Sequence, residues 1–415
     1  LARRPVLELS ELHSELIMIQ GASHSNKTLS CGAPEGGSLG NITKSYSADL
    51  SDTKNARSLR ARRYALQSVV RDILPNSRTA KCHRYKTPNK EIEVWRGVSA
   101  GVAGKAFYKG LMSCGRLWTC PVCAAKISER RRLELSEALD NAKDQGLSVY
   151  LLTQTIRHGI GDSLSGGLAG IAAAEKLLWS SRSGAAVRDR LGVVGTIKTT
   201  EVTWGAENGW HPHKHTLLIL KAPISPSVIQ SELSPLWINA CVKSGLPAPT
   251  RERGLTVQDG SFADKYVSKW GLESEMTKGH SKIAKVGGMT PFALVENVLE
   301  TGDAQSWALF QEYDKALKGK RQLVWSKGLR ALLLQGVAEK SDEELANEED
   351  PDVQAVFWAS LSVQEWKAIL HYKYRAVFLA KCEDCSPEIV QAWLNELTAC
   401  FAEERDGYIT PEGVL

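Results

Sequence analysis

Three histidines stand at alternate positions in the segment Trp210–Leu220, which reads WHPHKHTLLIL. The chain has nine histidines, so a third of them lie in this one short segment. Alternate residues of a β-strand point to the same face of the sheet. We therefore expect His211, His213 and His215 to share a face, with the apolar run after them buried. Paired imidazoles on a rigid strand could hold one divalent cation.

A carboxylate on the preceding segment could complete such a site. The segment VVGTIKTTEVTW predicts a second strand, and the turn GAENG joins it to the histidine segment. A hairpin centred on Glu207 would place Glu201 directly opposite His213. Two histidines and one carboxylate with open positions suit Mn²⁺, and Mg²⁺ at higher concentration. A register shifted by one or two residues would move Glu201 off the site, and His211 is an alternative partner for His213.

A tyrosine and a lysine three residues apart form the second chemical motif. The segment GSFADKYVSKWG predicts a short helix, which would bring Tyr266 and Lys269 to one face. A neighbouring cation favours the phenolate and can also bind a phosphate oxygen. Tyrosine is among the residues that act as covalent nucleophiles. We therefore expect a metal to polarise a phosphodiester while Tyr266 attacks it, which would let the same site cut and rejoin a strand.

Cysteines suggest a separate structural metal site. A C-x-x-C pair with two further thiols is typical of tetrahedral zinc, although His83 could replace one thiol and small buried cysteines are common without a metal. A second pair, Cys382 and Cys385, has no further cysteine pair near it. The predicted zinc ligands are Cys82, Cys114, Cys120 and Cys123.

The distribution of charge indicates a polyanionic partner. The first 335 residues carry 46 bases and 30 acids, whereas residues 336–415 carry 6 bases and 17 acids. A basic body of this kind favours nucleic acid, although a merely solvated charged surface has the same composition. Single-stranded DNA needs cations for its phosphates and aromatic rings for its bases. The candidate DNA-binding residues are Arg130, Arg131, Lys318, Lys320, Arg321, Trp325, Lys327 and Arg330.

The pattern along the chain predicts four regions. Residues 1–76 form a flexible arm with a short basic helix, and residues 77–128 form the cysteine-rich zinc module. Residues 129–335 form the main α+β domain, and residues 336–415 form an acidic linker with a helical C-terminal region. Strands are expected at 147–158, 193–204 and 210–220, and helices at 129–146, 169–182, 225–245 (interrupted near Pro235) and 361–381.

No stretch of the sequence approaches the ~20 apolar residues that a membrane span requires, and no secretory leader is recognisable. We therefore expect a soluble cytoplasmic protein with no membrane partner.

Taken in order, LLTQTIRH, HPHKH and YVSK resemble the three motifs of the bacterial plasmid rolling-circle replication initiators, which belong to the HUH endonuclease superfamily. The resemblance extends from about Cys82 to Arg330. It implies a central antiparallel sheet of five strands flanked by helices. It also implies that Tyr266 nicks one strand at the plasmid's double-strand origin, becomes linked to the 5′ phosphate and leaves a 3′-OH primer. The implied partners are origin DNA, single-stranded or cruciform at the nick, with the host helicase and polymerase.

Two positions depart from the pattern of this family. The residue between the paired histidines is usually hydrophobic but here is Lys214, and Phe262 stands where some relatives carry a carboxylate or a second tyrosine. Three alternatives to the initiator function stay open. They are a transposase with the same chemistry, a non-catalytic zinc protein that binds DNA, and a metallohydrolase in which Glu201 acts as base and water as nucleophile.

Overall fold

The computed structural model describes residues 53–99, 102–260, 288–348 and 354–407. The described residues divide into two compact units. The first unit lies within the ranges Leu1–Cys114, Leu299–Thr301 and Asn347–Leu415. The second unit lies within the ranges Gly115–Val298 and Gly302–Ala346. None of the helices within the described ranges is long and apolar enough to cross a bilayer.

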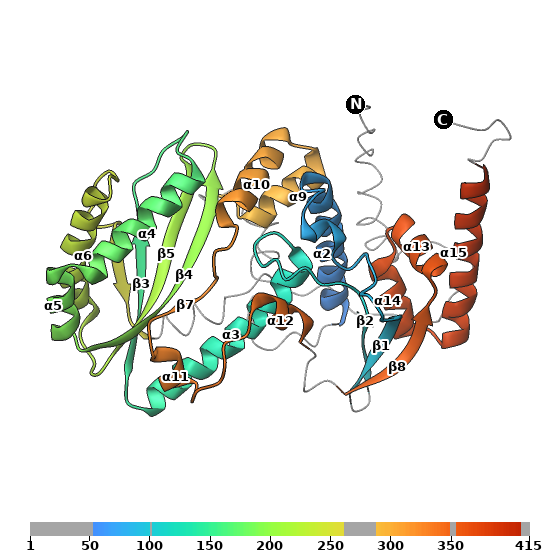
Figure 1. The fold of residues 1–415 in the computed structure, drawn as a ribbon, viewed down its shortest axis with the longest axis horizontal. Helices are drawn as coiled ribbons and strands as arrows, with labels where there is room; N and C mark the ends of the chain where they lie inside the picture. The colour runs from blue at the N-terminus through green and yellow to red at the C-terminus, as the bar shows by residue number, and fades with distance from the viewer. Residues whose placement is uncertain (1–52, 100–101, 261–287, 349–353, 408–415) are drawn as a thin grey trace, which may run out of the picture. The chain divides into compact units, whose positions relative to one another are not determined.

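The second unit is built on a five-stranded antiparallel sheet in the order β6-β3-β5-β4-β7 (Figure 1). The two long central strands, β4 and β5, are sequence neighbours, and β3 pairs with the other side of β5. The expected antiparallel sheet of an α+β fold is thereby confirmed. The strands are β3 (Ser148–Thr155), β4 (Val193–Gly205), β5 (Gly209–Leu220), β6 (Leu255–Gln258) and β7 (Val324–Trp325).

The β4–β5 hairpin has the register that the sequence predicts. Glu201 lies opposite His213, and the pairing continues to Gly205 opposite Gly209. Gly209 has φ +69°, a backbone conformation that favours glycine. Because the turn fixes which residues face each other, it also fixes which side chains share a face.

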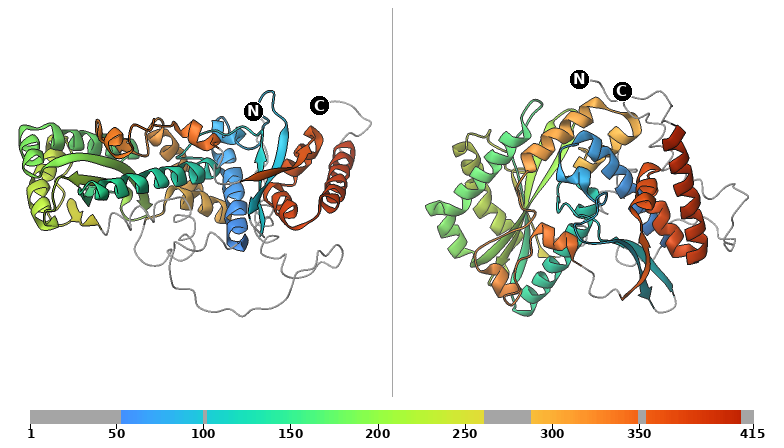
Figure 2. Two further views of the ribbon diagram at one scale, coloured as in Figure 1. Left: turned by 90° about the horizontal axis from the view of Figure 1, so that it is seen from below. Right: turned by 45° about the vertical axis from the view of Figure 1, so that its right-hand side comes forward.

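Helices cover both faces of this sheet (Figures 1 and 2). One face packs on α4 (Leu164–Ser180), α5 (Arg182–Arg190) and α6 (Pro226–Lys243) through a core that includes Leu152, Leu218 and Trp237. The other face packs on α3 (Pro121–Asp144) and α11 (Leu329–Leu333) through a core that includes Leu151, Leu217 and Leu139. The unit also contains α10 (Ala304–Leu317) and α12 (Asp342–Asn347), and α9 (Pro291–Thr301) precedes α10.

The expected interruption of the helix near Pro235 is wrong, because α6 continues through this residue. A proline inside a helix removes one backbone hydrogen bond and costs about 3 kcal/mol. Burial compensates for this cost, since Ile229, Leu233 and Trp237 on the same helix have no exposed surface.

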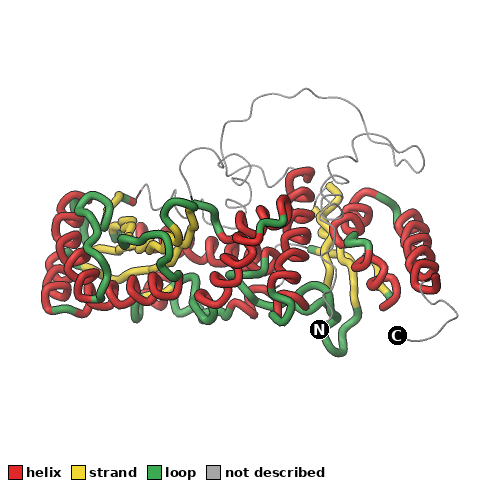
Figure 3. Tube along the Cα trace, turned by 90° about the horizontal axis from the view of Figure 1, so that it is seen from above, coloured by secondary structure: helices red, strands yellow, loops and turns green. Residues whose placement is uncertain are grey.

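The first unit contains a three-stranded antiparallel sheet in the order β2-β1-β8. Its strands are β1 (Ile92–Ser99), β2 (Val102–Lys109) and β8 (Ala355–Leu361), so the third strand comes from a distant part of the chain. Figure 3 shows these strands as a group beside helices of the C-terminal part. The helices are α2 (Thr53–Ile73), the 3₁₀ helix η1 (Arg78–Lys81), α13 (Val363–His371), α14 (Arg375–Asp384) and α15 (Pro387–Gly407).

Candidate metal centre and its surroundings

The histidine strand and its partner bring three metal-binding side chains together. The Nε2 atoms of His213 and His215 lie 3.1 Å and 3.2 Å from the same Oε2 atom of Glu201. One ligand atom from each of the three residues lies within 4.8 Å of the others. The sheet register places these side chains on the α3 face, next to the buried Leu217 and just beyond the apolar core.

The charge state of Glu201 agrees with this arrangement. Burial alone would raise the pKa of its carboxyl, but the hydrogen bonds to His213 and His215 outweigh burial and hold the pKa well below its usual range. The group is therefore an anion at neutral pH. Two imidazole nitrogens and a carboxylate oxygen form a donor set that fits Mn²⁺ or Mg²⁺ with further positions open.

The ring nitrogens that face away from Glu201 differ in their surroundings. The Nδ1 atom of His215 lies 3.1 Å from Oγ1 of Thr153, which is its direct partner across the strand pair β3–β5. This contact can orient the ring, as the outer hydrogen bonds of metal-binding histidines do. The Nδ1 atom of His213 is buried and has no hydrogen-bond partner among the described residues. Sequence reasoning missed Thr153, although it lies within the quoted motif LLTQTIRH.

His211 lies on the same strand but makes different contacts. Its Nδ1 atom contacts Nε2 of His158, whose own Nδ1 lies 2.9 Å from the backbone oxygen of Asn208. Burial and the nearby His213 and His158 lower the pKa of His211 to about 4. The described geometry therefore groups His213, rather than His211, with His215 and Glu201.

Lys214, the unusual residue between the paired histidines, points to the opposite face of the sheet. Its ammonium donates to Oε2 of Glu175 on α4, and Lys198 of β4 lies 2.5 Å from the other oxygen of that carboxylate. The Glu175 side chain is only 8% exposed. Burial would raise its pKa, but the two lysines outweigh burial and lower it. The positive charge at Lys214 is thus compensated within the protein.

Tyr266, Lys269 and Phe262 lie outside the described residues, so the tyrosine motif stays a prediction from the sequence.

The four candidate zinc ligands lie within the described residues. Cys82, Cys114, Cys120 and Cys123 are all buried, and their sulfur atoms lie within 4.8 Å of one another. Four thiols gathered in this way could hold a zinc ion.

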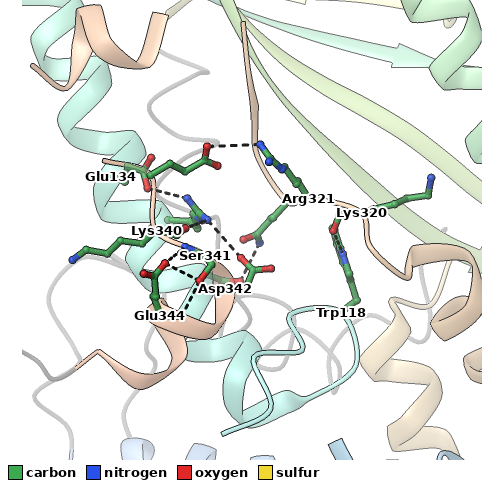
Figure 4. A network of polar contacts seen from close by, with 12 residues as sticks. Trp118, Glu134, Lys320, Arg321, Lys340, Ser341, Asp342 and Glu344 are labelled. Atoms are coloured by element: carbon green, nitrogen blue, oxygen red, sulfur yellow. Dashed lines mark hydrogen bonds and ion pairs between the residues drawn. The ribbon is translucent and has the colours of Figure 1, made fainter. Parts of the chain in front are cut away.

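Several of the candidate DNA-binding cations have partners within the protein (Figure 4). Arg131, whose side chain is 7% exposed, pairs with Glu134 and Asp342 and donates to the backbone oxygen of Lys340. Arg330 pairs with the same Glu134 at 2.9 Å. Arg321 lies 3.7 Å from Glu339 but stays 72% exposed.

The other candidates differ in exposure. Lys318, Lys320 and Lys327 are exposed, whereas Arg130 and Trp325 are half-buried. Trp325 belongs to β7 and packs against the core on the α3 face, beside Ile197.

Comparisons with known proteins find similarity to replication proteins. A family model described as a replication protein matches residues 110–242, a range that includes β3, β4 and β5. A Streptomyces lividans protein named "Protein rep" is 28% identical over 305 residues, which cover 57% of this chain and 67% of that relative.

A Streptomyces cyanogenus protein named "Neomycin resistance protein" is 35% identical over 142 residues, 28% of this chain and 32% of that relative. The match therefore spans about a third of this second relative. No solved structure matches the chain. The matches and the motifs together show that the chain is similar to replication proteins.

Proposed function

We propose that this chain initiates rolling-circle replication of a plasmid as an HUH endonuclease that nicks and rejoins one DNA strand. The observation that carries the proposal is the convergence of His213, His215 and Glu201 on one face of the central hairpin. The similarity to replication proteins supports it, and that similarity covers the same hairpin. A divalent cation bound there would polarise the scissile phosphodiester.

The chain's own residues carry out the transfer of the phosphate and the proton. The Tyr266 oxygen attacks the phosphorus, and the bond from phosphorus to the 3′ oxygen breaks. The phenol proton ends on the departing 3′-OH, which is then the primer for synthesis. Lys269, three residues after Tyr266 in the sequence, stabilises the phenolate and the phosphate. The reverse reaction restores the DNA strand, because the phosphotyrosine ester retains the energy of the broken bond.

Contacts to DNA outside the nick site are proposed for the exposed cations. Lys318, Lys320 and Lys327 are exposed, and the Arg321 side chain is 72% exposed. Arg131 and Arg330 act first as structural residues in this proposal, since Glu134 binds both of them. Zinc at the four cysteines would be structural.

The test is a covalent-adduct assay with 3′-labelled single-stranded DNA from the replicon that encodes the chain, incubated with Mn²⁺ and resolved on denaturing gels, because the fragment that stays on the protein carries the 3′ end. Wild type should yield a labelled protein band, and Tyr266→Phe should not. Tyr85→Phe is the matched control, because Tyr85 is a surface tyrosine that is 58% exposed.

A second pair of variants tests the metal centre. His213→Ala should abolish both cleavage and the adduct. His371→Ala removes a histidine paired with Glu404 at an exposed surface site and should leave both unchanged. Cleavage by wild type without any adduct would indicate water as the nucleophile and would overturn the tyrosine mechanism.

A further inference from the structure

One face of the three-stranded sheet in the first unit carries a row of aromatic side chains. Trp95 on the central strand β1 lies directly opposite Phe107 on β2 and opposite Phe357 on β8. Directly paired residues of antiparallel strands share a face. The rings of Trp95 and Phe357 lie 5.9 Å apart, edge to face. Three aromatic residues therefore cross the sheet side by side.

The opposite face of the same sheet already forms a core. Tyr108 on β2 packs against Trp366 of α13 and Phe378 of α14, with ring centres 5.1 Å and 6.3 Å away. The aromatic row, by contrast, stays accessible, since Phe357 is 53% exposed and Trp95 and Phe107 are only half-buried. These three large rings thus remain available to a ligand.

Cations accompany the aromatic row. The Lys109 ammonium lies 4.2 Å from the centre of the Trp95 ring, and Lys105, two residues before Phe107 on β2, is exposed. Glu93 is the only acidic residue in the three strands, and it accepts a hydrogen bond of 2.7 Å from the Trp95 indole. Residues 53–114, which include β1 and β2, contain 14 lysines and arginines but only 3 acidic residues.

We propose that this aromatic face binds single-stranded DNA, with bases stacked on Trp95 and Phe357 and phosphates bound by Lys105 and Lys109. Sheets that present aromatic rings beside cations bind single strands in this way, because every base has a face that can stack. A protein partner fits less well, since lysine is depleted at protein interfaces. The identity of the polymer rests on the proposed function, but the binding itself needs neither the metal nor Tyr266.

The experiment is fluorescence anisotropy with a labelled oligothymidine of about 20 nucleotides, in EDTA so that no cleavage occurs. Phe357→Ala should weaken binding at least about fivefold, the lower bound for loss of one base–aromatic stack. Val356→Ala is the matched control, because Val356 is the adjacent residue, is 51% exposed and pairs with Arg96 on the other face. Its affinity should stay within about twofold of wild type.

Two further variants separate stacking from a loss of folding. Trp95→Phe should retain most of the affinity for the oligonucleotide, whereas Trp95→Leu should lose it. The two variants should have the same melting temperature, so that a difference in affinity cannot come from unfolding. Lys105→Gln should reduce the slope of log affinity against log salt by about 0.7, the value for one phosphate contact to a single strand.

The proposal is overturned if Phe357→Ala and Val356→Ala bind equally well. It is also overturned if Phe357→Ala alters the sedimenting mass but not the DNA affinity, because the face would then join two copies of the chain. Failure of the nicking assay together with a positive anisotropy result would refute the proposed function and leave this inference standing.

Discussion

Replacing Glu175 by glutamine should destabilise the second unit strongly. The carboxylate lies between Lys198 and Lys214 and is 8% exposed, whereas the two lysine side chains are 20% and 14% exposed. Removing one member of a buried ion pair leaves its partner's charge uncompensated and costs about 3–5 kcal/mol. For a domain of this size each kcal/mol lowers the melting temperature by about 2–4 °C. The expected shift is therefore about 6–20 °C.

Urea and thermal unfolding followed by circular dichroism measure this change. The matched control is Glu232→Gln, which removes a carboxylate that pairs with Arg190 at the surface, where the two side chains are 35% and 57% exposed. Exposed pairs contribute at most about 1 kcal/mol. The triple variant Glu175→Leu with Lys198→Leu and Lys214→Leu should recover part of the loss, because apolar replacement of a whole buried ion-pair group is often neutral.

The pH dependence follows from the lowered pKa of Glu175. A carboxyl with a depressed pKa in the folded state contributes stability that is complete above its unfolded pKa and is lost as the pH falls through its folded value. The difference between wild type and Glu175→Gln should therefore be largest at neutral pH and shrink in acid. If Glu175→Gln is no less stable than Glu232→Gln at neutral pH, the ion-pair reasoning is refuted.

Two further predictions concern the metals. Thr153→Val should weaken Mn²⁺ binding about 10- to 100-fold in calorimetric titration, because the threonine hydroxyl contacts the outer nitrogen of His215. The control is Thr203→Val, which lies opposite His211 on the same face of the sheet. Equal Mn²⁺ affinities of the two variants would contradict the orienting role of Thr153. Elemental analysis of the purified wild-type protein should find tightly bound zinc, and Cys123→Ser should lose it. Cys400→Ser replaces an exposed thiol outside the cluster and should retain the zinc. Folded wild-type protein without zinc would contradict the structural zinc site.

The sequence by itself determined the local part of the candidate site. The alternation of histidines fixed their common face, and the short turn GAENG fixed the register that brings Glu201 opposite His213. Both results depend on residues close together in the chain, where strand periodicity and loop length decide the geometry. The same holds for the greater part of helix α3, whose apolar spacing indicated a helix from residue 129 onward, although the helix begins at Pro121.

Contacts between distant parts of the chain were decided only by the tertiary structure. Sequence analysis did not predict β8, and its pairing with β1 joins segments more than 250 residues apart. The ion-pair partner of Lys214 could not be predicted from the sequence either, because Glu175 lies on a helix 39 residues earlier in the chain. Glu134 forms ion pairs with Arg131 and Arg330, two of the candidate DNA-binding residues. Burial of its neighbouring side chains keeps α6 helical through Pro235. Each of these outcomes depends on which side chains meet in space, and periodicity along the sequence carries no information about such meetings.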